Sequence, residues 1–317
     1  MDQQAPQTME QSGQPSLPRQ KKSSGFARVR LGSRRTRESL RVDLAVTEHE
    51  MACTVTLAGE SVIVGNWHSS VEVDGEIPEP TSPWKEVCQF ADREAHHREY
   101  ERKLAPGIRQ QRQITVCPID GFVLFAETFL SPKQRDWVYN LRFSVSEDVE
   151  LRTARETHEI LVSGAGVKGL ILPLAFPEWK QGFNQGGITI IDNEIRMAYQ
   201  VTGRRFFFPV FLALWRVEHK LATAEDGENQ PDGLPEFTWR HLTVSECLRK
   251  VTNEEAVGYR IQIGDRQWVL YRSLTPPANR AVLGKNLISE SLLGRFKLDG
   301  TISPLVEVEL DDEEESD

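Results

Sequence analysis

The sequence predicts an all-β protein, a large two-sheet antiparallel sandwich of the supersandwich kind. Apolar and polar residues alternate most clearly in residues 136–145, where one strand face would carry Trp137, Tyr139, Leu141, Phe143 and Val145. Successive side chains of a strand point to opposite faces, so this segment has one buried and one solvated face. Similar segments recur with turn residues between them, and helical periodicity is scarce.

The first strands are predicted from the point where the alternation begins, at residues 41–46, 53–57, 61–64 and 70–75. Ala58-Gly59 and Asp74-Gly75 supply turns between them. Residues 92–105 are ambiguous, because pairs of opposite charge four residues apart favour a helix. Pro106-Gly107 and the strand-like residues 108–116 favour a β-hairpin instead, and this is the interpretation that we adopt.

Residues 121–130 form a nearly continuous apolar run, which is typical of a central strand covered on both faces. Further strands are predicted at residues 147–155, 159–163, 187–191, 194–202, 206–215, 238–248, 257–263, 267–274, 295–298 and 305–310. Asp192-Asn193 and Gly264-Asp265 are turns, and residues 222–235 form a polar surface loop. So many strands exceed a seven-stranded immunoglobulin-like domain and favour a larger sandwich.

The 317 residues carry a formal net charge of −9 that is unevenly distributed. We expect a disordered basic arm over residues 1–40, a β-sandwich domain over 41–310 and an acidic tail over 311–317. Residues 21–37 contain seven basic side chains and no acidic one. The ends either keep the protein soluble or recruit a partner. Nucleic acid is disfavoured as that partner, because only Phe26 is interleaved with the charges.

No apolar run approaches the ~18 residues of a membrane span, and the N-terminus has no apolar signal region. These observations predict a cytoplasmic protein without a membrane segment. The four cysteines, Cys53, Cys88, Cys117 and Cys247, form no CxxC pair. We therefore expect buried, reduced thiols, no zinc site and no cofactor.

Three phrases resemble the β-sandwich half of heparinase II/III-like polysaccharide lyases. They are DGFVLFAE at residues 120–127, GGITII at 186–191 and QWVLYRSLTPPANR at 267–280. The last phrase also resembles uncharacterised planctomycete proteins. The resemblance covers roughly residues 40–310. Such lyases combine this sandwich with an N-terminal helical toroid that carries most of the catalytic residues. No helical domain is predicted before the strands here, so the resemblance implies the fold without that half.

Four residues are candidates for carbohydrate binding: Trp239, His241, Arg142 and Arg205. Trp239 and His241 share one face of a predicted strand with Thr243 and Ser245. Sugars bind to aromatic faces with polar groups beside them. Arginines on strand faces hold carboxylates or sulfates through the planar fork of the guanidinium. Arg142 and Arg205 belong to a larger set of arginines on predicted strand faces, whose other members are Arg155, Arg196, Arg204, Arg260 and Arg272. The alternative is a solvated strand face with cross-strand ion pairs.

No residue is predicted to be catalytic or to bind a metal. His96 and His97 lie near acidic residues, but adjacent strand residues point to opposite faces and do not easily share one ion. His158 is interpreted as a strand-surface histidine rather than an oriented base. The chain has no GxSxG, HExxH or nucleotide-binding motif, and the glycine-rich residues 164–169 form a turn.

The sequence therefore favours a non-catalytic sandwich that binds a glycan or a protein, with an acidic glycan as the candidate ligand. Two alternatives stay open: a polysaccharide-active lyase or hydrolase, and an intracellular scaffold that uses its charged tails. A groove with a histidine and a tyrosine or carboxylate pair would favour the enzyme, whereas tryptophan and arginine alone would favour binding.

Overall fold

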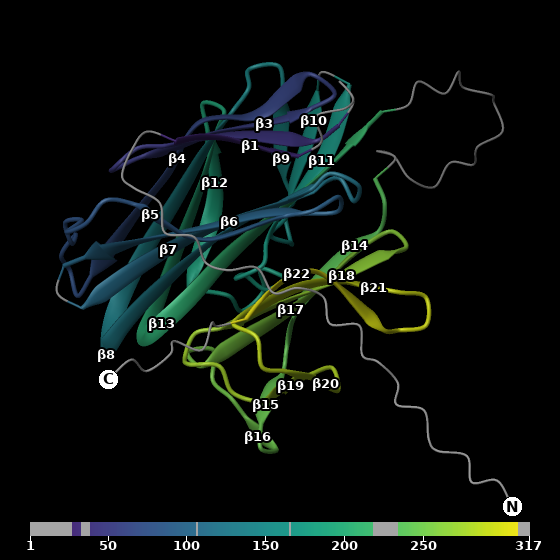
Figure 1. Cartoon of the computed structure of the whole chain (residues 1–317). Helices are drawn as coiled ribbons and strands as arrows, with labels where there is room; N and C mark the ends of the chain where they lie inside the picture. Colours follow the sequence, from purple (N-terminus) through teal and green to yellow (C-terminus); the bar gives the residue numbers. More distant parts are fainter. Residues whose placement is uncertain (1–26, 33–38, 106, 165, 218–233, 310–317) are drawn as a thin grey trace, which may run out of the picture.

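The computed structural model describes residues 27–32, 39–105, 107–164, 166–217 and 234–309, and the fold is an all-β sandwich, as predicted (Figure 1). Every regular element in these ranges is a strand, and the strands form sheets of thirteen, five and four members. Within the same ranges, no helix is long and apolar enough to cross a membrane.

The thirteen-stranded sheet folds back on itself through two long strands. β8 (Phe122–Val145) pairs antiparallel with β13 (Glu194–Arg216), with a register shift between Gly203 and Arg205. The ring of Phe125 lies 4.9 Å from that of Phe143, and the ring of Phe129 lies 5.5 Å from that of Tyr139. Both pairs are symmetric about residue 134, so the two halves of β8 face each other.

Each of these long strands was predicted as two separate strands. The segment between the halves of β8 is polar and contains Pro132, and a proline cannot donate a hydrogen bond to a sheet, so the local pattern is typical of a break between strands. In β13 the break was expected near Gly203. The chain bends at both places without leaving the sheet, because β8 and β13 are paired on both sides of the bend, at Arg135–Gly203 and at Leu130–Arg205. Trp137 Nε1 also donates to the Gly203 carbonyl oxygen at 2.7 Å.

The fold-back creates an outer and a middle layer. The outer layer contains residues 135–145 of β8 and 194–203 of β13 with β1 (Ala27–Gly32), β2 (Arg41–Val46), β3 (Met51–Leu57), β4 (Glu60–Val73) and β12 (Gly186–Ile191). The middle layer contains the other halves of β8 and β13 with β5 (Lys85–Ala91), β6 (His96–Leu104), β7 (Ile108–Cys117), β9 (Glu150–Thr153), β10 (Ile160–Gly164) and β11 (Val167–Pro173).

A five-stranded C-terminal sheet covers the second face of the middle layer (Figure 1). Its strands are β14 (Phe237–Leu242), β17 (Ala256–Ile263), β18 (Arg266–Ser273), β21 (Ser291–Phe296) and β22 (Ile302–Val308). A small sheet adjoins it and contains β15 (Val244–Glu246), β16 (Arg249–Lys250), β19 (Arg280–Val282) and β20 (Lys285–Leu287).

Two apolar cores lie on the two faces of the middle layer. Phe125 packs toward Trp67 and Phe143 of the outer layer. Phe122, three residues earlier in β8, points to the opposite face and packs toward Phe211 and Trp268 at the C-terminal sheet. The prediction of a central strand at residues 121–130 covered on both faces is thus confirmed.

The predicted hairpin around residues 106–107 is confirmed, because β6 pairs antiparallel with β7 from His96–Val116 to Leu104–Ile108. Ala58-Gly59 and Asp192-Asn193 are two-residue hairpin turns, and all four residues have positive φ, which hairpins of this kind require.

Part of the segment expected to be disordered is instead a strand. β1 pairs with β2, and Leu31 is 2% exposed because the alternation from Arg28 to Leu31 turns its apolar side to the core. The expectation for residues 1–40 is therefore wrong over Ala27–Gly32. Residues 1–26 and 33–38, the acidic tail and most of the polar loop at 222–235 lie outside the described residues.

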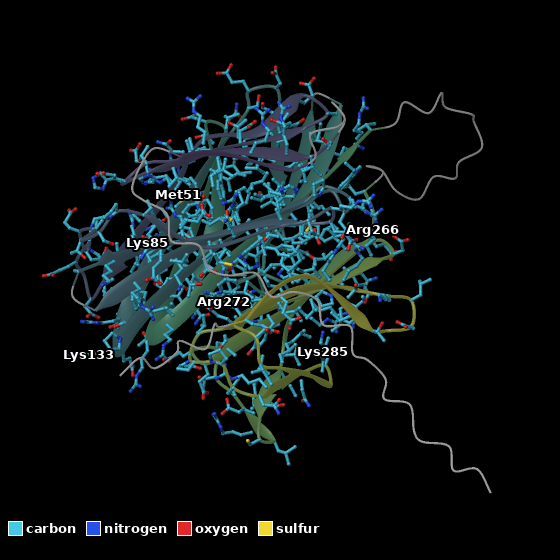
Figure 2. The ribbon with its side chains drawn as sticks, in the orientation of Figure 1. Met51, Lys85, Lys133, Arg266, Arg272 and Lys285 are labelled. Atoms are coloured by element: carbon cyan, nitrogen blue, oxygen red, sulfur yellow. The ribbon has the colours of Figure 1, made fainter. Side chains whose placement is uncertain are left out.

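Strand β7 is polar and yet buried on both faces at residues 110–113, whose sequence is QQRQ. Gln111 and Gln113 point to the C-terminal sheet, where Arg272 is 1% exposed. Arg272 is labelled in Figure 2. Its Nη2 lies 2.9 Å from Glu99 Oε1, 2.8 Å from Gln111 Oε1 and 3.0 Å from Glu290 Oε1. We call this group the interlayer joint.

Electrostatics keep the joint charged. Burial alone would raise the pKa of Glu99, but the charge of Arg272 and the hydrogen bonds from Arg272 and Gln113 together hold it below its usual value. The neighbouring His97 is 3% exposed, and its Nδ1 lies 2.8 Å from Thr115 Oγ1. Burial lowers the pKa of His97 from 6.5 to about 4, so the ring is neutral at pH 7.

Replacing Arg272 by alanine should lower the free energy of unfolding by about 3–5 kcal/mol, because Glu99 is then left buried without its partner. The matched control is Arg109→Ala on β7, whose exposed ion pair with Glu101 should contribute less than ~1 kcal/mol. Urea denaturation measures both. Equal effects of the two substitutions would show that the joint does not stabilise the fold.

Stability should also fall as the pH is lowered from about 6.5 to about 4. In that window the unfolded chain binds a proton at His97 that the folded chain excludes, so unfolding becomes easier, by up to about 3 kcal/mol. His97→Gln should flatten this part of the dependence relative to the unsubstituted protein. The unfolding free energy, measured in urea at several pH values, checks this, and parallel curves for the two proteins would contradict it.

Candidate functional site

The outward face of the outer layer presents a row of polar side chains across three strands. In β8, Leu141 and Phe143 are buried, so Arg142 between them points to solvent. Strand register places Arg142 between His68 of β4 and Arg196 of β13. Side chains directly opposite on antiparallel strands have Cβ atoms about 5 Å apart, so these three form one ladder.

A groove of about 320 Å³ lies beside this ladder. It is lined by Asn140, Leu141, Arg142, Gly187, Ile188, Thr189, Arg196, Met197 and Ala198. The polar lining comes from the outward residues of β8, β12 and β13. Gly187 contributes no side chain, and a Cβ built there would meet no atom within 4 Å. The groove therefore offers a guanidinium, an amide and a hydroxyl around an open floor.

The two arginines of the groove differ in whether an ion pair already engages their guanidinium groups. Arg196 Nε lies 2.5 Å from Glu194 Oε1, so part of its charge is already compensated. Arg142 is exposed and forms no ion pair or side-chain hydrogen bond with any described residue. Its guanidinium keeps its whole donor fork for a ligand, and a planar fork suits a carboxylate or sulfate.

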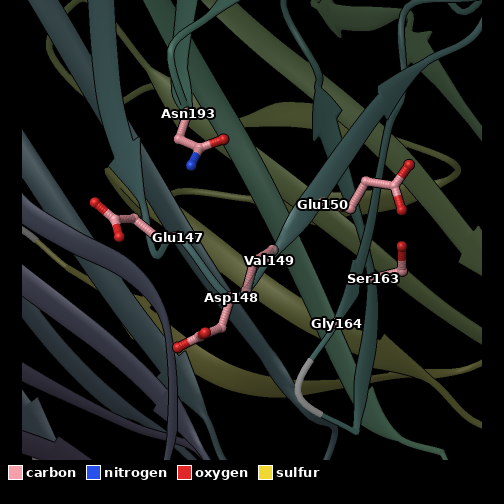
Figure 3. Close-up of a pocket in the computed structure, with 7 residues that line it drawn as sticks. All are labelled: Glu147, Asp148, Val149, Glu150, Ser163, Gly164 and Asn193. Carbon is pink, nitrogen blue, oxygen red and sulfur yellow. The ribbon is translucent and has the colours of Figure 1, made fainter.

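A second, wider pocket of about 510 Å³ lies at the turn that follows β8 (Figure 3). It is lined by Glu147, Asp148, Val149, Glu150, Ser163, Gly164 and Asn193. Figure 3 shows the three carboxylates pointing in different directions, and no group of three potential ligands for a metal occurs among the described residues. The carboxylates would repel an anionic ligand, so an acidic ligand suits the groove at Arg142 better.

The four predicted carbohydrate-binding residues do not come together. Trp239 is 1% exposed, and its Nε1 donates to the Phe176 carbonyl oxygen at 2.9 Å. The expected open aromatic face is therefore absent at this residue, because this side of β14 packs on the middle layer. His241 is exposed on the same strand, with its ring 4.6 Å from that of Tyr259.

Arg142 alone of the four lines the groove, while Arg205 is half-buried next to the bend of β13. The groove residues Asn140 and Thr189 were missed by the sequence analysis. Asn140 was visible as an outward residue of its strand. Thr189 belongs to the strand that the predicted turn at Asp192-Asn193 joins to β13, but only the long-range pairing of β13 with β8 brings it to the same groove as Arg142. Arg196, a member of the wider arginine set, does line the groove.

Several other candidates have structural roles. Arg272 belongs to the interlayer joint. His158 was expected on a strand surface but is 3% exposed, with its Nδ1 2.7 Å from the Pro177 carbonyl oxygen and its ring against Phe176 and Phe183. None of the four cysteines, all of which lie in the described residues, forms a disulfide. Cys53 and Cys117 are buried as expected, but Cys247 is exposed in the β15–β16 turn.

A buried polar cluster between the outer and middle layers was not predicted. Ser69 Oγ donates to Glu127 Oε2 at 2.9 Å and accepts from Arg112 Nη2 at 2.7 Å, while Arg112 Nε lies 3.2 Å from Glu127 Oε1. Tyr139 makes no hydrogen bond of good geometry here, although Glu127 is near enough to affect its titration. Burial, with a smaller effect of Glu127, raises the pKa of Tyr139 well above its usual value, which makes it a poor base.

Comparisons with known proteins identify the fold. No family model and no curated protein matches the sequence. The heparan sulfate lyase HepC from Pedobacter heparinus matches in structure with a TM-score of 0.51, and a mutant of it with 0.52, both at 10% identity over 82% of this chain and 43% of the lyase. A heparinase III matches with a TM-score of 0.50 over the same shares, also at 10% identity.

The chain thus spans less than half the length of these lyases, and its sandwich resembles part of the heparinase structure, as the sequence phrases indicated. The first and third phrases lie in contacts between layers, while the second, at residues 186–191, is β12 and contributes Gly187, Ile188 and Thr189 to the groove. Trp268 Nε1, from the third phrase, donates to Oδ2 of Asp120, from the first phrase, at 2.8 Å. Glu127 and Arg272, also from these phrases, are buried in polar clusters. The first and third phrases therefore reflect how the layers of the fold pack together.

Replacing Trp239 by phenylalanine should lower the free energy of unfolding by about 1–3 kcal/mol, since the Phe176 carbonyl loses its buried donor. The matched control is Trp179→Phe, because Trp179 is 58% exposed and its replacement should leave stability unchanged. Thermal or urea unfolding measures both. Weaker glycan binding by Trp239→Phe at unchanged stability would instead place a ligand at this side chain.

Proposed function

We propose that this protein binds an acidic glycan at the groove between β8, β12 and β13, without chemical conversion of the ligand. The observation that carries the proposal is the exposed guanidinium of Arg142, which has no ion-pair partner among the described residues and stands at the rim of a groove. A uronate carboxylate or a sulfate would accept two hydrogen bonds from such a fork.

The other lining residues support a sugar rather than a simple anion. Asn140 lies two residues from Arg142 on β8, and Thr189 lies opposite Arg196 on β12, so both offer donors and acceptors for hydroxyl groups in the same groove. The open floor at Gly187 leaves room for a ring. Arg196 can exchange part of its contact with Glu194 for a second anionic group. An acidic glycan combines these features in one ligand.

The comparisons support the choice of ligand class and leave the reaction open. The heparan sulfate lyase with this fold is named for an acidic glycan, which makes that class the first to test. The groove itself is lined by donors rather than by a pair of titrating groups, which favours binding over catalysis. A lyase is the second candidate, because His68 lies directly beside Arg142 and would place a base next to a group that neutralises a carboxylate.

Calorimetric titration with heparan sulfate and uronate oligosaccharides tests the proposal. Arg142→Ala should weaken binding by about tenfold or more, because a charged hydrogen bond contributes about 1.5–3 kcal/mol. Arg240→Ala is the matched control, since Arg240 is exposed on β14, away from the groove, and its loss should leave affinity unchanged. Added salt should weaken binding.

Absence of heat across the glycan panel, or equal affinity of Arg142→Ala and the unsubstituted protein, would contradict the proposal. The absorbance of unsaturated uronate products is followed in the same samples. Product formation that is abolished by His68→Ala would establish the lyase alternative in place of simple binding.

A further inference from the structure

The basic residues of β1 extend the outward face on which the groove lies. Leu31 is buried and Val29 packs on the core. Arg30, between these two residues, and Arg28, which precedes Val29, therefore point outward. β1 is the edge of the same continuous sheet, in the order β1-β2-β3-β4-β8-β13. Arg28, Arg30 and Arg142 therefore share one face of the outer layer, and four strand spacings of about 4.8 Å give about 19 Å between β1 and β8.

Small residues lie between the two basic groups. The row that starts at Arg28 continues through Ala45 of β2 and Ala52 of β3 to Asn66 of β4. Asn66 is exposed, and two residues farther along β4 His68 stands beside Arg142. No long side chain stands in this row between Arg28 and Asn66, so an extended chain can lie flat across the strands.

Two carboxylates beside the path are held by arginines. Asp43 is shared by two arginines, with Arg30 Nε at 2.6 Å and Arg41 Nε at 3.7 Å. Glu194 is held by Arg196. Glu72 and Asp136 lie toward the end of the sheet where β8 bends, because Val73 pairs with Trp137 there. A polyanion on the path would meet the arginines first.

We infer that the glycan site is one end of a longer track, and that the protein prefers long acidic glycan chains which reach from Arg196 across β8, β4, β3 and β2 to Arg28 and Arg30. This inference rests on the proposed function, since it takes the groove at Arg142 as the anchor. A single bound chain would contact both the groove and β1, and the second set of contacts would increase its affinity, as in other ligands that bind two linked sites.

The test compares a uronate tetrasaccharide with a chain of twelve or more sugars in calorimetric titrations of the full-length protein. The unsubstituted protein should bind the long chain at least about tenfold more tightly per binding site than the tetrasaccharide. The double variant Arg28→Gln, Arg30→Gln should lose this gain and keep its affinity for the tetrasaccharide within about twofold, because only the track beyond the groove is changed. Arg142→Ala should weaken the binding of both the tetrasaccharide and the long chain.

Circular dichroism and thermal unfolding confirm that the double variant is folded, and the single variants Arg28→Gln and Arg30→Gln serve if it is not. Unchanged long-chain affinity in a folded variant overturns the track and leaves the groove intact. If the unsubstituted protein bound neither the tetrasaccharide nor the long chain, the proposed function itself would be contradicted. Tighter binding of a single-stranded RNA of matched charge, with the same dependence on Arg28 and Arg30, would overturn a glycan as the occupant.

Discussion

The fold-back of β8 and β13 is the constraint on which the rest of the structure depends. Each strand runs through two layers, so the aromatic residues of its two halves face each other across one core, as Phe129 and Tyr139 do. The side chains that point away from this core lie in different environments in the two layers. On the middle layer they are covered by the C-terminal sheet, and on the outer layer they remain in solvent. The same alternation thus yields a buried Phe122 and an exposed Arg142 on one strand.

Covering the middle layer on both faces explains why so many polar residues are buried. The end of β7 near Gln110 has polar side chains on both faces, and each face has its own network: the cluster of Ser69, Arg112 and Glu127 on one side and the interlayer joint at Arg272 on the other. Buried charges require partners of matching geometry, which also specify how the sheets align. The first and third phrases that resemble the lyases lie in these contacts, whereas the second phrase, at residues 186–191, is β12 and lines the proposed site.

The sequence contained enough information for the fold class and for most turns, because strand alternation and positions such as Asp192-Asn193 act locally. It did not show that β8 and β13 continue through Pro132 and Gly203, since a bend within a sheet and a break between strands have the same local signal. The burial of Trp239 depends on the packing of its sheet against the middle layer, and Arg142 shares a groove with Thr189 only because β8 pairs with β13. Both are long-range consequences that a periodicity of two does not contain.

The central claim is that an acidic glycan binds on the outer layer, with Arg142 as its anchor. Nuclear magnetic resonance of the arginine side chains tests it most directly, with the Nε–Hε signals of Arg142, Arg196 and Arg240 assigned by single lysine substitutions. Titration with a uronate oligosaccharide should shift and slow the exchange of the Arg142 signal first and Arg196 next, and leave Arg240 on the C-terminal sheet unchanged. Shifts confined to Arg240, or no shift at Arg142 at saturating ligand, would contradict the account.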